Sequence, residues 1–234
     1  MGVISGVIIG AIGSILAVIV IELFLRSRPA LFLFGSSYRL AIRLRREGII
    51  AFQFTREDYR ERLPTFLSYA DHSIAIVSIS LRLTSDEGEL LQLFKNRIAE
   101  RSDFRIAISL ISPKSPAAAL AAASLNITGD YLVNEEIRPM LRKLVGIRND
   151  LPESDRPRLR ILVHNFFPMG SAILLDADPT QGRIQVETKL FRAPRIESFG
   201  YEVVGASPFY SRNYRAWMRV IDASVPVTDE DFIN

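Results

Sequence analysis

Cysteine is absent from the 234-residue sequence, and histidine occurs only twice, as His72 and His164. The absence of cysteine excludes disulfide bonds, thiolate zinc sites and a cysteine nucleophile. Two histidines are too few for a multi-histidine metal site. We therefore expect neither a metal centre nor a bound cofactor.

Common catalytic motifs are missing as well. The sequence has no Gly-rich loop followed by Lys-Ser or Lys-Thr, no GxSxG turn and no HExxH pair. No motif therefore supports a P-loop nucleotide hydrolase, a serine hydrolase of the α/β type or a zinc protease. The net charge of +3 is small, so nucleic acid is not an expected partner.

Lysine is scarce, and the positive charge is therefore mostly arginine. Arginine favours bidentate pairing with phosphate and carboxylate groups. One group of arginines, Arg212, Arg215 and Arg219, is spaced to share a face of an expected C-terminal helix. We interpret this stripe as a solvated helix face, with a phosphate-facing surface as the alternative. The only lysines are Lys95, Lys114, Lys143 and Lys189.

A long apolar run, residues 1–25, opens the chain and contains a single charged residue, Glu22. At about 1.5 Å per residue, a helix of this length crosses a hydrocarbon core of roughly 30 Å. A cleaved signal peptide is the competing interpretation. It fits poorly, because there is no basic segment before the run and no small-residue cleavage pattern after it. We therefore predict a transmembrane helix over residues 1–25.

Arginines follow this apolar run, whereas no basic side chain precedes it. The positive-inside rule then places the C-terminal domain in the cytoplasm, so we expect a single-pass protein of the cell membrane. Arginines near a bilayer can contact anionic head groups, although a solvated linker face is an equally good interpretation. The candidate membrane-surface residues are Arg26, Arg28, Arg39, Arg43 and Arg46.

Small residues recur every four positions in the apolar run, at Gly2, Gly6, Gly10 and Ser14. Such a stripe lets a second helix approach closely, which favours self-association of the anchor. The alternative is that glycine is simply common in membrane spans.

The rest of the chain has the pattern of an α/β domain with a mixed sheet and helices on its faces. Expected strands near residues 73–81 and 104–112 alternate with helices, and later strands follow one another closely. We expect four parts: a transmembrane helix over 1–25, a basic juxtamembrane linker over 26–53, the α/β domain over 54–224 and an acidic tail over 225–234.

The stretch most informative about chemistry runs from Leu159 to Asp176. It contains two expected strands, the first ending at His164 and the second ending at Asp176. Two segments precede this stretch, YADHSIAIVSISL and FRIAISLISPKSP, and an expected helix with a capping residue lies between them. The segment that follows the stretch reads GYEVVGASPFYSRNYRAWMRVI.

This order of segments over about residues 54–224 resembles a single phospholipase D-like module. That superfamily carries the motif HxKxxxxD on a strand, in which His is the nucleophile, Lys binds phosphate and Asp closes the strand. Here Met169 stands in the place of His, Ser171 in the place of Lys, and only Asp176 matches. The resemblance also implies a homodimer, because two motifs meet at a twofold interface and this chain has the length of one half.

The replaced residues argue against the family's chemistry. Methionine cannot form a phosphohistidine-type intermediate, and serine cannot neutralise a transferring phosphoryl group. We therefore favour a non-enzymatic domain that binds a protein partner, an anionic lipid or another phosphate-containing ligand. The candidate ligand-binding residues are Ser171, Asp176, His164 and Arg212.

Two other hypotheses remain open. One is a phosphodiesterase or phosphatidyl-transfer enzyme with an atypical site at a dimer interface, using His164 and Asp176 as catalytic residues. His164 also reads as a strand-end histidine with a satisfied hydrogen bond, and Asp176 as a strand-terminal turn residue. The other hypothesis is a membrane-surface scaffold without any small-molecule site.

Overall fold

A computed structural model of the chain describes residues 35–82, 87–168, 170–190, 192–193 and 197–233. The chain forms two compact units, residues 1–46 and 47–234. The described part of the first unit is the helix α3 (Gly35–Arg46). The predicted span over residues 1–25 lies outside the described residues, as do Arg26 and Arg28. Within the part of the chain that is described, no helix is long and apolar enough to cross a membrane.

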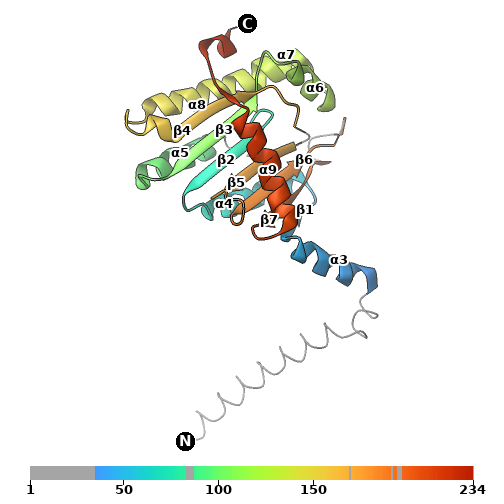
Figure 1. Ribbon diagram of the computed structural model, residues 1–234. Helices are drawn as coiled ribbons and strands as arrows, with labels where there is room; N and C mark the ends of the chain where they lie inside the picture. The colour runs from blue at the N-terminus through green and yellow to red at the C-terminus, as the bar shows by residue number, and fades with distance from the viewer. Residues whose placement is uncertain (1–34, 83–86, 169, 191, 194–196, 234) are drawn as a thin grey trace, which may run out of the picture. The chain divides into compact units, whose positions relative to one another are not determined.

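The second unit is built on one mixed sheet of eight strands in the order β1-β7-β6-β5-β2-β3-β4-β8 (Figure 1). Strands β2, β3 and β4 are parallel, and every other neighbouring pair is antiparallel. The strands are β1 (Ile49–Gln53), β2 (Ser73–Ser78), β3 (Arg105–Ile111), β4 (Leu159–His164), β5 (Gly170–Leu175), β6 (Arg183–Thr188), β7 (Phe199–Val204) and β8 (Val225–Pro226). The mixed α/β architecture expected from the sequence is therefore confirmed.

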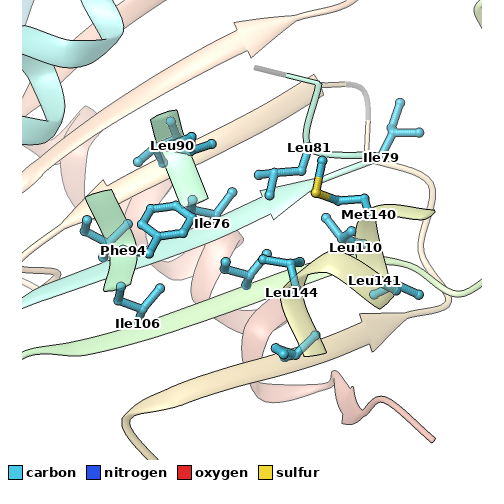
Figure 2. Close-up of a cluster of buried hydrophobic side chains, with 14 of the residues drawn as sticks. Ile76, Ile79, Leu81, Leu90, Phe94, Ile106, Leu110, Met140, Leu141 and Leu144 are labelled. Carbon is cyan, nitrogen blue, oxygen red and sulfur yellow. The ribbon is translucent and has the colours of Figure 1, made fainter. Parts of the chain in front are cut away.

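Helices cover both faces of this sheet. One face packs against a large apolar core formed with α4, α5, α6 and α8. Figure 2 shows part of this core, in which Leu90 and Phe94 of α5 meet Ile76 and Ile106 of the sheet. The other face is covered by the single helix α9, which crosses it in Figure 1. The helices are α4 (Arg56–Ser68), α5 (Glu87–Glu100), α6 (Pro116–Ser124), α7 (Gly129–Tyr131), η1 (Leu132–Ile137), α8 (Arg138–Asp150), η2 (Arg156–Arg158), α9 (Pro208–Asp222) and η4 (Asp229–Phe232).

Local chemistry explains where the main helices begin. Thr55 accepts a hydrogen bond from the Asp58 amide, and the Asp58 side chain accepts one from the Thr55 amide, which is a reciprocal cap at the start of α4. Ser115 and Ser207 cap α6 and α9, and each is followed by a proline at the first helical position.

Both expected boundaries of the α/β domain change. We expected residues 49–53 in the linker, but they form β1, which pairs with β7 at the edge of the sheet. We expected a separate acidic tail over 225–234, but Val225 pairs with Val163 of β4, and the Asp231 side chain is buried as a cap of η4. The compact unit therefore begins at residue 47 and includes the described tail.

Candidate functional site

The strand on which the sequence resemblance places the motif is β5, and it runs antiparallel to its neighbour β2. Ile74 pairs with Leu175, and Val77 pairs with Ala172. Ser171 therefore lies where β2 ends, and Asp176 lies where β2 begins. Met169 lies outside the described residues.

Ser171 is fully buried (0% exposed), and its Oγ lies 3.0 Å from Oγ of Ser78 at the end of β2. Gly170 before it is required by the close approach of β5 to β6. A Cβ at that position would lie 2.0 Å from the backbone oxygen of Glu187. The start of β5 is therefore pressed against β6, and Ser171 faces the interior on the α4 side of the sheet.

A small hollow beside Ser171 is enclosed by charged side chains from other elements. Its volume of about 10 Å³ is about the space of one water molecule. The carboxylate of Glu187 on β6, itself 1% exposed, lies 3.6 Å from Nε of Arg56 and 3.2 Å from Nζ of Lys189. The residues that line the hollow are Arg56, Ser78, Ile79, Ser80, Arg82, Leu125, Ser171, Glu187 and Lys189.

A second buried carboxylate extends this charged cluster. Glu136 of η1 accepts a hydrogen bond from Ser80 Oγ at 2.9 Å and lies 3.5 Å from Nη1 of Arg82. Arg56 also donates a hydrogen bond to the backbone oxygen of Arg82. The cations around the hollow are thus engaged by protein carboxylates and a carbonyl, and no base contacts Ser171 among the described residues. This arrangement can hold a water molecule but contains no activated nucleophile.

Asp176 has a structural role at the opposite end of the sheet. Its carboxylate accepts hydrogen bonds from the backbone amides of Asp71, His72 and Ser73, at 2.7, 2.6 and 2.7 Å. Three charge-assisted bonds hold the turn before β2 onto the end of β5. The interpretation of Asp176 as a turn residue is therefore confirmed.

His164 is the last residue of β4 and is almost completely buried, at 1% exposed. Its Nδ1 lies 3.0 Å from the Phe166 carbonyl oxygen, so Nδ1 carries the proton and donates it. Burial lowers the pKa of His164 to about 4, because the imidazolium loses its hydration. His164 is thus a neutral strand-end histidine, as the structural interpretation of the sequence predicts.

The structure does not bring the four candidate ligand-binding residues together. His164 ends β4, which is parallel to β2, whereas Asp176 lies at the beginning of β2, so the two residues occupy opposite ends of the sheet. Arg212 lies on α9, across the sheet from Ser171, with its Nη2 3.7 Å from Glu47 Oε2. The atypical catalytic pair His164 and Asp176 therefore cannot form within one chain.

Sequence reasoning missed the charged residues of this cluster: Arg56, Arg82, Glu187 and Lys189, which line the hollow, and Glu136, which contacts Ser80 and Arg82. No local signal identifies Glu187, because its alternation with Val186 is typical of a solvent-facing residue, whereas the structure buries both faces of β6. Among the described residues, no three His, Asp or Glu side chains are grouped to hold a metal ion.

A larger open hollow of about 590 Å³ lies at the ends of β3 and β4, beside the start of α6. Leu120 and Phe167 on its wall are exposed, by 60% and 37%, and Phe166 beside it is exposed by 50%. Apolar side chains gathered at an exposed hollow are typical of a contact surface. Its lining residues are Ser112, Lys114, Ser115, Pro116, Ala117, Leu120, Asn165 and Phe167.

Comparisons with known proteins give similarities of fold only. No protein-family model matches the sequence, and no curated protein matches it. One similar structure is that of TrmBL2, an archaeal chromatin protein, with a TM-score of 0.49 and 10% identity, covering 95% of this chain and 71% of that chain.

Two further similar structures come from bacteria. Nuc, a phospholipase D family member from Salmonella typhimurium, has a TM-score of 0.41 and 10% identity, covering 76% of this chain and 99% of that chain. Phosphatidylserine synthase from Haemophilus influenzae Rd KW20 has a TM-score of 0.37 and 8% identity, covering 83% of this chain and 52% of that chain. At these identities the likeness concerns the chain path and extends to no activity.

Replacing Asp176 tests its structural role. We expect Asp176→Asn to lower the free energy of unfolding by about 1–3 kcal/mol, because an amide offers one acceptor oxygen to three backbone N–H donors. Denaturant unfolding of the full chain in detergent measures the change. Asp150→Asn is the control, since the Asp150 side chain is 65% exposed and its loss should cost less than about 0.5 kcal/mol. Equal effects of the two substitutions would contradict the role.

Burial of His164 predicts a pH dependence of stability. The pKa is about 4 in the folded chain and about 6.5 when unfolded. The unfolded chain therefore binds the proton first, and stability present above pH 6.5 is lost as the pH falls toward 4. Between pH 7 and pH 4.5, the wild type should lose about 2–3 kcal/mol more than His164→Gln. His72→Gln is the control, since the side chain of His72 is 71% exposed and its contact with Asp103 lies at the surface, so its loss should change the wild-type curve far less than the loss of His164. Parallel curves for the wild type and His164→Gln would refute the prediction.

Proposed function

We propose that the chain is a membrane-anchored, cytoplasm-facing phospholipase D-like domain that has lost phosphodiesterase chemistry and acts by binding a ligand or a protein partner. The observation that carries this proposal is the position of Glu187. Its carboxylate occupies the charged hollow beside Ser171 and engages both Arg56 and Lys189.

The chemistry of the hollow argues against catalysis. Phosphodiester transfer requires a nucleophile with a base near it and cations free to stabilise the transferring group. Ser171 is buried and its Oγ contacts Ser78 Oγ, with no base beside it among the described residues, while Arg56 and Lys189 already face a carboxylate. The alternative of an atypical enzyme loses support, because His164 is buried, neutral and far from Asp176.

Membrane attachment rests on the sequence. The apolar run over residues 1–25 has the length of a span, and the arginines that follow it favour a cytoplasmic domain. In the described helix α3, Arg43 and Arg46 are exposed, so they can contact anionic head groups. The bilayer is therefore a proposed partner, together with an anionic lipid or another phosphate-containing ligand.

A homodimer is the second proposed partner. The exposed Leu120, Phe166 and Phe167 lie at the ends of β3 and β4, where an apolar contact would remove them from water. In a twofold dimer the same patch contacts itself on both subunits. The small-residue stripe in the predicted span adds a second place for self-association.

An assay for phosphodiesterase activity tests the loss of catalysis. We expect the full chain in lipid nanodiscs to hydrolyse bis-p-nitrophenyl phosphate and phosphatidyl lipids no faster than empty nanodiscs, because no activated nucleophile faces the hollow. Asp176→Asn and His164→Gln should leave this background unchanged. Turnover that falls in Asp176→Asn or His164→Gln, while an unfolding measurement shows a folded protein, would overturn the proposal.

Disulfide cross-linking tests the dimer, because the chain has no cysteine of its own. We expect Phe166→Cys to form a disulfide-linked dimer in membranes on mild oxidation, since a residue near a twofold axis meets its own copy. Phe54→Cys is the matched control; Phe54 is 80% exposed at the end of β1, on the far edge of the sheet from β8. Cross-linking of Phe54→Cys alone, or of neither variant, would contradict a dimer through this patch.

A further inference from the structure

Among the described helices, α9 alone covers the second face of the sheet, and its outer side is basic. Tyr210 and Ile221 are buried against the sheet, and Trp217 and Met218 are partly buried there. The arginines at positions 212, 215 and 219 point outward and are exposed. Amphipathic packing thus leaves a row of guanidinium groups on the outer surface of this layer.

Most of this positive charge has no protein counter-ion. Arg212 lies near Glu47, but no acid pairs with Arg215 or Arg219 anywhere in the described chain. Helix α8 on the opposite face offers a contrast, since its Lys143 forms an ion pair with Glu87 at 2.6 Å. The α9 side therefore presents free cations to an external anion. Asp222, at the C-terminal end of α9, is the one exposed acid of the helix.

Exposed aromatic rings lie on the same face. Phe52 of β1 pairs with Tyr201 of β7, and Tyr201 packs against Phe209 of α9 with ring centroids 5.8 Å apart. Because paired strand residues point to the same face, Phe52 lies on the α9 side. Phe54 follows two residues later, is 80% exposed and has its ring 6.4 Å from that of Phe52.

The chain also begins this unit beside α9. Glu47 is its first residue, its carbonyl accepts a hydrogen bond from Ser207 Oγ, and its carboxylate faces Arg212. Residues 26–46 connect it to the predicted span. A fully extended chain of this length reaches at most about 70 Å, so an anchored chain keeps the domain within reach of the bilayer.

We propose that the face formed by α9 and the exposed rings of β1 docks onto an anionic lipid bilayer. The arginines at 212, 215 and 219 contact phosphate-bearing head groups, while Phe52 and Phe54 enter the interfacial layer, where aromatic rings are favoured. This inference rests on the proposed membrane anchoring and adds which face of the domain the bilayer contacts. The opposite face, covered by α5 and α8, then points to the cytoplasm.

The absence of cysteine permits a direct test with the full chain. Ala216→Cys, exposed on α9 between the arginines, and Ala99→Cys, exposed on α5, are a matched pair of alanine positions on opposite faces. Each variant is labelled with the polarity-sensitive dye NBD and reconstituted in vesicles with 30% phosphatidylserine, with and without spin-labelled lipid. We expect spin-label quenching at position 216 at least about threefold stronger than at position 99.

Charge and lipid composition supply the second measurement. Replacing Arg215 and Arg219 by Gln should lower the ratio of docked to undocked domain about fivefold per arginine, since each contributes about 1 kcal/mol near an anionic surface. Quenching at position 216 should fall accordingly, and it should also fall in vesicles of phosphatidylcholine alone. Equal quenching at positions 216 and 99, or no response to either change, would overturn the docking.

Flotation of the same vesicles after alkaline carbonate separates the two proposals. Protein that floats but shows equal quenching at positions 216 and 99 refutes the docking face and leaves the membrane anchor standing. Protein that does not float refutes both the anchor and the docking that rests on it.

Discussion

A buried carboxylate organises the region where the catalytic motif of this fold would lie. Glu187, near the end of β6, is almost inaccessible to water, and an unpaired charge there would cost several kcal/mol. Arg56 from the start of α4 and Lys189 just after β6 neutralise it from two sides. Because the charge of Glu187 must be paired, the first turn of α4 is fixed against the sheet. The side chains that meet Glu187 leave space for no more than about one water molecule.

The same polar layer continues beneath α4 toward the edge of the sheet. Glu202 on β7 pairs with Arg62 at 2.8 Å and accepts a hydrogen bond from Gln53 at 3.2 Å. Burial raises the pKa of the Tyr59 hydroxyl in this layer, because the phenolate would lose its hydration. A buried polar network of this kind specifies one register of neighbouring strands, since a slip would leave charges unpaired. The core on the other half of the same face is apolar and does not require charges to be paired in one register of the strands.

The sequence predicted the order of strands and helices well, because each element carries a local signal. Thr55, Ser115 and Ser207 are caps that mark helix starts, and the apolar runs before Pro113 and at residues 73–78 predict the central strands. The site was less predictable, because its geometry depends on pairing between distant strands. The antiparallel placement of β5 puts Asp176 at the opposite end of the sheet from His164, and nothing local reveals that direction. Likewise, Glu187 looks solvent-facing beside Ile184 and Val186, yet both faces of β6 are buried.

The pairing of Glu187 also decides what the hollow can bind. A phosphate group entering it would have to take Arg56 and Lys189 away from the carboxylate. Glu187 would then remain as a buried, uncompensated charge, which costs about 3–5 kcal/mol when one partner of a buried pair is removed. The cations of the hollow are therefore reserved for an internal anion, whereas Arg215 and Arg219 on α9 meet no acid among the described residues. In the docking that we propose, anions are therefore recognised at the outer surface of α9 and not in the hollow beside Ser171.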